Sequence, residues 1–296
     1  MKVLNYGSLN YDFTYQVSHM VRPGETLASQ QLQTHCGGKG FNQSVALSRA
    51  GVKVYHAGMI GEDGQQFLDI CKEEGIDTGF IRECPGKSGH AIIQVNPQGE
   101  NCILLHGGTN QMNSAEQIEE VLEHFEEGDI LLLQNEINLL EELIGKAYEK
   151  GMKIVLNPSP FEEKLLDYGL ERVNTFLINE TEGRQMSGKE SPEDILKELR
   201  LKFPKSEMVL TLGEKGVCYM DASGETVSVS AYRVDAVDTT AAGDTFTGYY
   251  LAGLLQGRER KEILKRACAA SALAVMKKGA AASIPRAEEV DAFMEE

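Results

Sequence analysis

Short apolar runs alternate with helical patterns along most of this chain, and that alternation restricts its fold more than any other feature. The runs with the length and composition of buried strands cover residues 2–7, 52–58, 129–134, 153–158, 175–179 and 207–212. The patterns between them predict helices over Gln43–Ala50, Gln65–Glu74, Ser114–Glu126 and Leu139–Lys150, each followed by a glycine (Gly51, Gly75, Gly128, Gly151) that closes the last turn. Apolar strands alternating with helices predict an α/β fold: a Rossmann-like, mostly parallel central sheet with helices on both faces.

Two stretches, residues 12–36 and 88–106, read as strands and turns without a helix. The second contains the turn sequence Asn-Pro-Gln-Gly at residues 96–99, a strong hairpin signal. We expect the two stretches to form a small antiparallel β-sheet. Because a few strands alone are marginally stable, this sheet should pack on the main body or on a second subunit, as a lid over the strand ends. The length of 296 residues suits one large domain spanning residues 1–296.

The charge and cysteine content exclude several classes of protein. The net charge of -16 argues against a nucleic-acid or anionic-membrane surface, which needs basic patches. The six cysteines are scattered without zinc-ligand spacing, which is typical of reduced thiols. The N-terminus is polar from residue 5, unlike a signal peptide, and no apolar run approaches the roughly 18 residues of a membrane span. We therefore expect a cytoplasmic protein.

The segment DTTAAGDTFTG, residues 238–248, places two acids among very small residues. A strand ending near Val237 would lead through this segment into a helix from about Asp244 to Gln256. Ala241, Ala242 and Gly243 would leave backbone N–H groups bare at the helix N-terminus, which is an anion site. A carboxylate at Asp244 could then accept a hydroxyl proton as a phosphoryl group arrives. The alternative is that Asp244 only caps the helix.

The sequence CGGKGFNQ, residues 36–43, brings glycines to the start of another helix. Lys39 there would reach a ligand, or it is an exposed lysine in a plain glycine turn. The stretch is not a dinucleotide fingerprint, because Gln43 stands where the last glycine belongs. Likewise, PGKSG at residues 85–89 is not a phosphate-binding Walker loop, because Ile81 stands where its first glycine belongs.

Polar side chains follow three other predicted strands. Asn10 and Asp12 come after the first strand and would share one face, either as ligands of neighbouring hydroxyls or as an Asx turn. Glu136 follows the strand at 129–134, as a ligand or a helix cap. Asn179 and Glu182 come after the strand at 175–179 and would orient phosphate and hydrated Mg²⁺, or form a capping box.

Taken in order, the motifs GSxNxD, GGKGxNQ, NPxP, NETE, TLGxxG, DTxAAGDTFxG and KKGAxxSxP resemble the ribokinase-like carbohydrate kinases, the PfkB family. The resemblance runs from Gly7 to Pro285. It implies transfer of the γ-phosphoryl group of ATP, with Mg²⁺, to a sugar hydroxyl, and a β-sheet lid through which we expect a homodimer. The pairing of NxD with GGKGxNQ is similar to the ribose kinases rather than to fructokinases or nucleoside kinases, which implies D-ribose 5-phosphate as the product.

The resemblance also implies roles for particular residues. Asp244 would be the catalytic base, and Ala241, Ala242 and Gly243 would form the anion hole. The ribose-binding positions would be Asn10, Asp12, Gly38, Lys39, Asn42 and Glu136. The nucleotide and Mg²⁺ side would comprise Asn179, Glu182, Thr211, Gly213, Gly216 and Gly243. A monovalent-cation site, taken by K⁺, would comprise Asp238 and Thr240 with the loop near Ala280 and Ser283.

Two positions depart from the family pattern. Cys268 stands on the helix that lines the adenine pocket in relatives, where ribose kinases can carry a histidine. Phe41 is bulkier than the alanine common at that position, and we expect it to press on the sugar pocket. A kinase for another small substrate (deoxyribose, a ketose or a nucleoside) is thus one alternative, and a non-catalytic sugar- or nucleotide-binding regulator is another.

Overall fold

A computed structural model describes residues 1–295 and contains the predicted central sheet. Its strands are β1 (Val3–Tyr6), β4 (Val54–Ile60), β5 (Asp77–Glu83), β8 (Ile130–Gln134), β9 (Lys153–Asn157), β10 (Thr175–Asn179), β11 (Glu207–Thr211), β12 (Val217–Met220) and β13 (Thr226–Val229). They lie in the order β13-β12-β11-β10-β9-β8-β1-β4-β5. From β11 to β5 all pairs are parallel, and only β12 and β13 are antiparallel.

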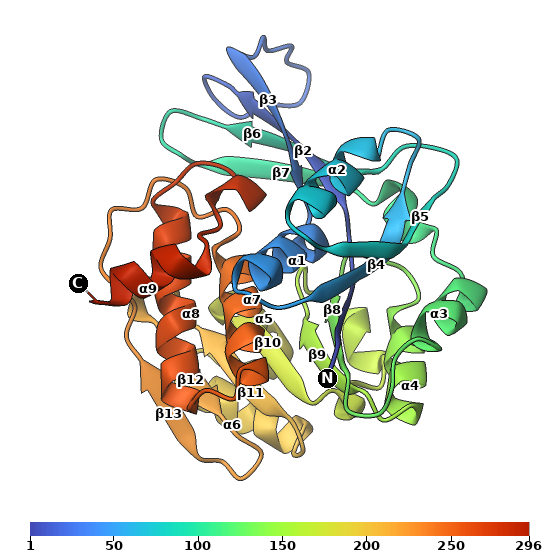
Figure 1. The fold of residues 1–296 in the computed structure, drawn as a ribbon. Helices are drawn as coiled ribbons and strands as arrows, with labels where there is room; N and C mark the ends of the chain where they lie inside the picture. The colour runs from blue at the N-terminus through green and yellow to red at the C-terminus, as the bar shows by residue number, and fades with distance from the viewer. Residues whose placement is uncertain (296) are drawn as a thin grey trace.

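Helices cover both faces of this sheet (Figure 1). One face carries α1 (Lys39–Arg49), α2 (Gln65–Glu73), α7 (Ala242–Leu255), α8 (Arg260–Val275) and α9 (Ala287–Glu295). The other carries α3 (Ala115–Leu122), α4 (Leu140–Glu149), α5 (Glu180–Ser187) and α6 (Pro192–Lys202). Alternate residues of β8 enter the two cores: Ile130 and Leu132 face the first, Leu131 and Leu133 the second. A strand buried on both faces must be apolar throughout, which is why these runs could be predicted.

The lid is a second sheet, made of β2 (Asn10–Gln16), β3 (Gln31–Gly37), β6 (Gly89–Val95) and β7 (Asn101–His106) in the order β3-β2-β6-β7. It stands above the strand ends of the main sheet (Figure 1). The expectation of a wholly antiparallel lid is wrong in its centre, because β2 and β6 pair in parallel. Both strands enter from the same side of the body, so they run in the same direction. Residues 17–30 form a loop rather than strand.

Two predicted element boundaries also differ. No strand ends near Val237; the amides of Val237 and Asp238 instead donate to the carbonyl of Val275 at the end of α8, at 2.7 and 3.1 Å. This segment is therefore tied to a helix end and not to the sheet. In addition, α1 begins at Lys39 rather than Gln43, because Gly38, with φ of 91°, serves as its N-cap. Within residues 1–295, no helix has both the length and the hydropathy needed to cross a bilayer.

Candidate active site

A cleft of about 200 Å³ opens where the carboxyl ends of β9, β10 and β11 meet the N-termini of α1 and α7. Such an edge is the usual ligand site of an open α/β sheet. Its polar lining comes from every one of these elements: Lys39, Asn157, Ser159, Asn179, Glu182, Thr211, Thr239 and Asp244. Asn157 and Ser159 were not singled out from the sequence, although their motif, NPSP, directly follows a predicted strand.

The N-terminus of α7 forms one wall of this cleft with Ala241, Ala242 and Gly243. Ala241 is the N-cap and adopts the left-handed conformation, with φ of 59°, which turns the chain into the helix. The amide of Ala242 makes a long bond of 3.3 Å to the carbonyl of Thr239. The amides of Gly243 and Asp244 donate to no acceptor among residues 1–295. These bare donors at the positive end of a 14-residue helix suit an anion.

Asp244 lies in the first turn of α7 and is 7% exposed. Its side chain makes no capping bond. Instead, Oδ2 accepts from Asn42 Nδ2 at 3.0 Å, and Oδ1 accepts from Gln43 Nε2 at 2.9 Å. The alternative of a helix cap is therefore excluded, and the carboxylate is held at the cleft by side chains of α1.

A group of acids surrounds Lys39 on the lid side of the cleft. Burial raises the pKa of Asp12 to about 7, the neighbouring carboxylates of Glu136 and Asp244 add to this effect, and Lys39 opposes it. Burial also raises the pKa of Glu136, against the opposing effect of Lys39. Burial would lower the pKa of Lys39, but the carboxylates of Asp244, Glu136 and other neighbours outweigh it, so that pKa is raised. The ammonium group therefore stays charged and links the acids electrostatically.

Polar contacts fix the remaining side chains predicted to bind ribose. Asn10 Oδ1 accepts from the buried Asn110 Nδ2 at 2.7 Å, and Asn10 Nδ2 donates to Glu136 Oε2 at 3.5 Å. The same Glu136 oxygen accepts from the Ser8 hydroxyl and from the Lys39 amide at 3.0 Å. Ser8 and Asn110 were missed in the sequence: Ser8 stands in the motif GSxNxD but was given no role there, and Asn110 stands in none of the motifs.

Gly38 and Asn42 complete this lid-side group. A side chain on Gly38 would bring its Cβ within 2.9 Å of the Asn10 amide, so only glycine lets α1 approach β2 this closely. Asn42 Oδ1 is buried and has no partner within residues 1–295. An unpaired buried acceptor is costly, and a ligand hydroxyl would satisfy it.

The nucleotide-side predictions divide into two groups. Asn179 and Glu182 form a complete capping box at the start of α5, and both also line the cleft, so the two interpretations of these residues are compatible. Thr211 lies beside them, its hydroxyl donating to the Ile178 carbonyl at 3.3 Å. Gly213 and Gly216 lie outside the cleft lining, in and after the short turn Gly213–Lys215. Gly216, with φ of 108°, lies too close to the Val229 carbonyl for any side chain.

Asp238 joins the α7 approach to the loop between α8 and α9. Its Oδ1 accepts from the Thr240 amide at 2.9 Å and hydroxyl at 2.6 Å, and its Oδ2 accepts from the Gly279 amide at 3.0 Å. Burial alone would raise the pKa of Asp238, but these hydrogen bonds outweigh it and lower that pKa. The contacts to Thr240 form an Asx turn, and the contact to Gly279 connects this turn to the loop after α8. Ala280 and Ser283 lie in the same loop, where the Ser283 hydroxyl donates to the Ala280 carbonyl at 2.9 Å.

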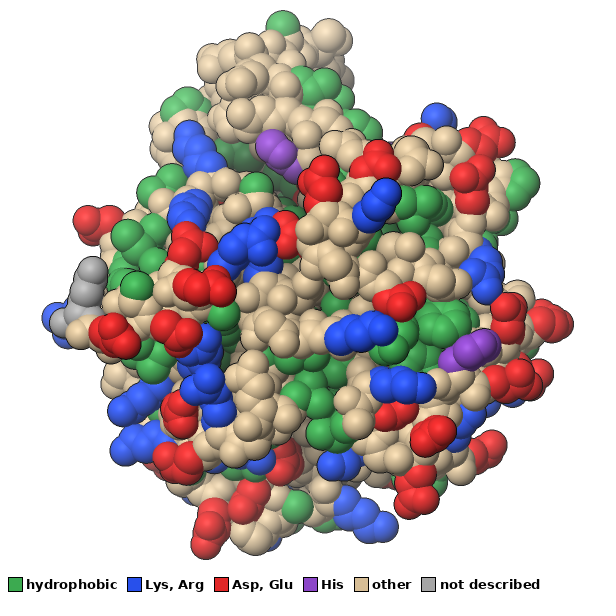
Figure 2. All heavy atoms as spheres, viewed as in Figure 1, with side chains coloured by type: hydrophobic (Ala, Val, Ile, Leu, Met, Phe, Trp, Pro, Cys, Tyr) green, Lys and Arg blue, Asp and Glu red, His purple; other side chains and the backbone are tan. Residues whose placement is uncertain are grey.

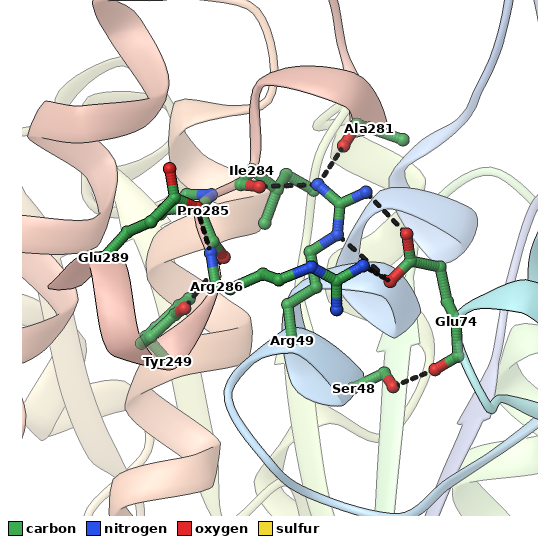
Figure 3. Close-up of polar contacts among 9 residues, drawn as sticks. All are labelled: Ser48, Arg49, Glu74, Tyr249, Ala281, Ile284, Pro285, Arg286 and Glu289. Atoms are coloured by element: carbon green, nitrogen blue, oxygen red, sulfur yellow. Dashed lines mark hydrogen bonds and ion pairs between the residues drawn. The ribbon is translucent and has the colours of Figure 1, made fainter.

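The far end of α1 holds this loop in place (Figure 3). Arg49 donates to the carbonyls of Ala281 at 3.0 Å and Ile284 at 2.5 Å, and its guanidinium pairs with both oxygens of Glu74 at 2.6 and 3.1 Å. Arg286 reaches the same carboxylate at 3.4 Å. A bidentate pair of this kind orients the guanidinium strongly. One helix therefore touches the acids around Lys39 at its start and the loop near Asp238 at its end.

Phe41 and Cys268, the two departures from the family pattern, both lie in the hydrophobic core. Phe41 is fully buried and packs against the ring of Phe67 at 5.4 Å, so its bulk is accommodated in the core and does not line the cleft. Cys268 is buried in the same core, where burial raises the pKa of its thiol to about 12. It too lies outside the cleft lining, and its contact with a nucleotide base stays a prediction.

Comparison with known proteins extends these similarities to the whole chain. The family model described as pfkB family carbohydrate kinase matches residues 1–287. Ribokinase of Haemophilus influenzae is 36% identical over 98% of this chain and 97% of its own length. Deoxyribokinase of Salmonella typhi is 31% identical over 99% of each. The structure of Arabidopsis thaliana ribokinase complexed with ribose and ATP matches with a TM-score of 0.86 at 26% identity, over 100% of this chain and 99% of that one. This chain therefore belongs to the pfkB family of carbohydrate kinases.

Proposed function

We propose that this chain, acting as one domain, transfers the γ-phosphoryl group of ATP to D-ribose and forms D-ribose 5-phosphate and ADP. The observation that carries the proposal is the position of Asp244: a buried carboxylate held by two amides, beside bare backbone donors, at the junction of the cleft and the acids around Lys39. The ribokinase of Haemophilus influenzae and the Arabidopsis thaliana ribokinase that binds ribose and ATP support the choice of substrates.

The geometry accounts for the chemical step. Asp244 takes the proton from the sugar hydroxyl as that oxygen bonds to the γ-phosphorus, and the bond to the leaving ADP oxygen breaks. The amides of Gly243 and Asp244 and the Lys39 ammonium stabilise the negative charge that spreads over the phosphoryl oxygens. When bound, Mg²⁺ neutralises charge on the phosphates. The carboxylate of Glu182, 4% exposed and lining the cleft, fits it as an oxygen ligand, direct or through water.

The side chains on the lid side fit a polyol. Asp12 and Glu136 are carboxylates that accept hydrogen bonds from hydroxyl groups, Asn10 offers an amide, and Asn42 offers its unpaired Oδ1. Each sugar hydroxyl that binds there replaces its lost water contacts, and a sugar lacking one hydroxyl leaves a buried acceptor unpaired.

A second candidate substrate is 2-deoxy-D-ribose, favoured by the similarity to Salmonella typhi deoxyribokinase. The test is coupled ADP release with ribose, deoxyribose, hexoses, ketoses and nucleosides, for the wild type and Asp244→Asn. We expect the highest kcat/KM with ribose, and a fall in kcat of about 10²- to 10⁴-fold in the variant, with sugar binding nearly unchanged. A higher kcat/KM for another sugar would make that sugar the substrate. Wild-type turnover by Asp244→Asn would reject the assignment of Asp244 as the catalytic base.

We also propose a K⁺ site at Asp238. Within residues 1–295 no three His, Cys, Asp or Glu side chains gather as metal ligands, so a cation here would depend on one carboxylate and backbone carbonyls. Such hard oxygen ligands suit a weakly held monovalent ion. Two contacts of this loop support the proposal: the Gly279 amide donates to Asp238, and Arg49 fixes the loop further along by donating to the carbonyls of Ala281 and Ile284.

We further propose that the lid forms a homodimer interface. Every residue of its edge strand β7 is exposed, and Ile103, Leu104 and Leu105 are 57%, 67% and 41% exposed. Figure 2 shows the lid projecting from the body, with hydrophobic side chains along its flank. An exposed apolar edge strand pairs readily with another chain.

The cytoplasm is the compartment we propose for the protein. All six cysteines are free, and reducing conditions keep thiols in that state. ATP as a substrate is consistent with the same compartment.

A further inference from the structure

The two amides that hold Asp244 come from consecutive residues of α1 but have different surroundings. Asn42 has a spare oxygen that suits a sugar hydroxyl. Gln43 is fully buried, and both polar atoms of its side chain are bonded within the protein: Nε2 to Asp244 Oδ1 at 2.9 Å, and Oε1 to Gln134 Nε2 at 2.7 Å. Gln43 therefore cannot serve as a substrate ligand in this arrangement. Its contacts connect Asp244 to side chains of β8 and β1, which α1 covers.

These contacts form a chain of amides whose direction is set by a backbone group. Asn5, in the middle of β1, donates through Nδ2 to the carbonyl of Gly40 at 2.6 Å and to Ser44 Oγ at 2.8 Å. Its oxygen must then face Gln134, which donates to it through Nε2 at 2.9 Å. The second proton of that Nε2 goes to Gln43 Oε1, so Gln43 presents its own NH₂ group to Asp244. A carbonyl cannot donate, so the order of donors follows from the Gly40 end.

Two glycines make room for this chain. Gly7 faces the side-chain oxygen of Gln134, and a methyl group at Gly7 would overlap it. Gly248 of α7 lies against Ala46 of α1, where a Cβ would come within 2.8 Å of the Ala46 carbonyl carbon. The close contact of the two helices brings Gln43 within reach of Asp244.

Burying this chain of amides in the core carries a free-energy cost. Asn5, Gln43 and Gln134 are all fully buried, in or beside strands that are otherwise apolar, and Gln134 Oε1 has no partner within residues 1–295. Leaving such a group unpaired carries a free-energy cost, whereas apolar residues of the same shape can be nearly neutral. From this we infer that Gln43 and Gln134 are positioning residues: they hold the carboxylate of Asp244 in one orientation, through an order of hydrogen-bond donors set at the Gly40 carbonyl. The inference rests on the proposed role of Asp244 as the base.

Gln43→Leu and Gln134→Met test it. Removing the Gln43 donor leaves Oδ1 of a buried carboxylate unpaired, and losing Gln134 lets the Gln43 amide turn its oxygen toward Asp244. For Gln43→Leu we expect kcat to fall about 10-fold or more, with the sugar KM within about threefold of wild type. The KM for ATP should likewise stay within about threefold of wild type, because neither glutamine contacts a substrate. Gln134→Met should lower kcat in the same way but by less, and it stays informative if Gln43→Leu does not fold.

The matched control is Ser206→Ala, which removes a buried hydrogen bond of 2.6 Å to the Val173 carbonyl, away from the cleft. It should lower stability and leave kcat unchanged once kcat is corrected for the folded fraction. A purely structural role for Gln43 and Gln134 would likewise leave the corrected kcat unchanged, and that result overturns the inference. Asp244→Asn is assayed beside them: if it is inactive while the glutamine variants keep the wild-type kcat, only the positioning role fails; if it is active, the base assignment itself fails.

Discussion

The acids around Lys39 make a site whose charge depends on pH near neutrality. Burial and the carboxylates of Glu136 and Asp244 raise the pKa of Asp12 to about 7, with Lys39 opposing. A sugar hydroxyl donates to a carboxylate more strongly than to a carboxylic acid, so binding favours the ionised form of Asp12. With Asp12 as a sugar ligand, as proposed, sugar binding and loss of the Asp12 proton are coupled.

The coupling predicts the pH dependence of sugar affinity without nucleotide. Affinity should rise from about pH 6 to about pH 8, with a midpoint near 7, because the ionised form of Asp12 predominates only above its pKa. Titration calorimetry in two buffers of different ionisation enthalpy should show a proton released on binding below that midpoint. Asp12→Asn should bind about 10-fold more weakly and lose this slope. A variant that keeps both the slope and the proton release would show that another group titrates.

At the scale of elements, the approach to α7 is connected to the end of α8 and to the loop after it. Val237 and Asp238 bond to the Val275 carbonyl, Asp238 bonds to Gly279, and Arg49 of α1 bonds to Ala281 and Ile284 (Figure 3). The backbone that carries the unpaired amides of Gly243 and Asp244 is therefore connected to a loop more than thirty residues away in the chain. A cation bound in that loop would stiffen the same backbone.

We predict that activity rises when K⁺ replaces Na⁺ at constant ionic strength, and that Asp238→Ala loses this response and about 10-fold or more of kcat, because the anion-hole donors lose their alignment. The control is Asp221→Ala. Asp221 accepts from the Ser223 hydroxyl at 2.6 Å and the Glu225 amide at 2.9 Å in an exposed turn. Its hydrogen bonds therefore resemble those of Asp238, but it lies outside the proposed cation site. A flat K⁺ titration of the wild type, or an intact response in Asp238→Ala, would reject the cation site.

At the scale of the whole molecule, the lid is the part least covered by its own chain. The main sheet is buried between two helical layers, whereas β3 and β7 are the two edges of a four-stranded sheet that stands above them (Figure 1). Over the body, acidic and basic side chains are interspersed among hydrophobic ones, whereas the projecting part of the lid shows few charged side chains (Figure 2). A second lid would cover this surface.

Light scattering should therefore give the mass of a dimer for the wild type and of a monomer for Leu104→Glu, because a buried charge without a partner opposes association. Leu201→Glu is the matched control: Leu201 is 78% exposed on α6 and lies outside the lid, so its variant should stay dimeric. A wild type that is monomeric at high concentration would reject the dimer. A Leu104→Glu variant that stays dimeric would place the interface elsewhere.

The main sheet and the list of candidate residues were predictable from the sequence, for local reasons. Strands buried on both faces are apolar throughout and stop where polar ligands begin, so β1, β8, β9, β10 and β11 could be located to within a residue or two. The motif DTTAAGD carries its chemistry locally, since small residues and an acid at a helix start define an anion site. The pairing of strands that are distant in the sequence is not a local property, and the parallel pairing of β2 with β6 was mispredicted.

Tertiary structure alone decided what each candidate side chain contacts. From the sequence, Asp244 fits both a helix cap and a catalytic base. The structure distinguishes the two, because Asn42 and Gln43 of α1 donate to its carboxylate. Phe41 sits between glycine-rich sequence and a predicted ligand, yet its side chain turns into the core toward Phe67. Gln134 carries no signal in the sequence, and Gln43, although it stands in the motif GGKGxNQ, is given no role by that motif. Their role depends on partners more than ninety positions away, which the chain brings together only when β1, β8, α1 and α7 pack.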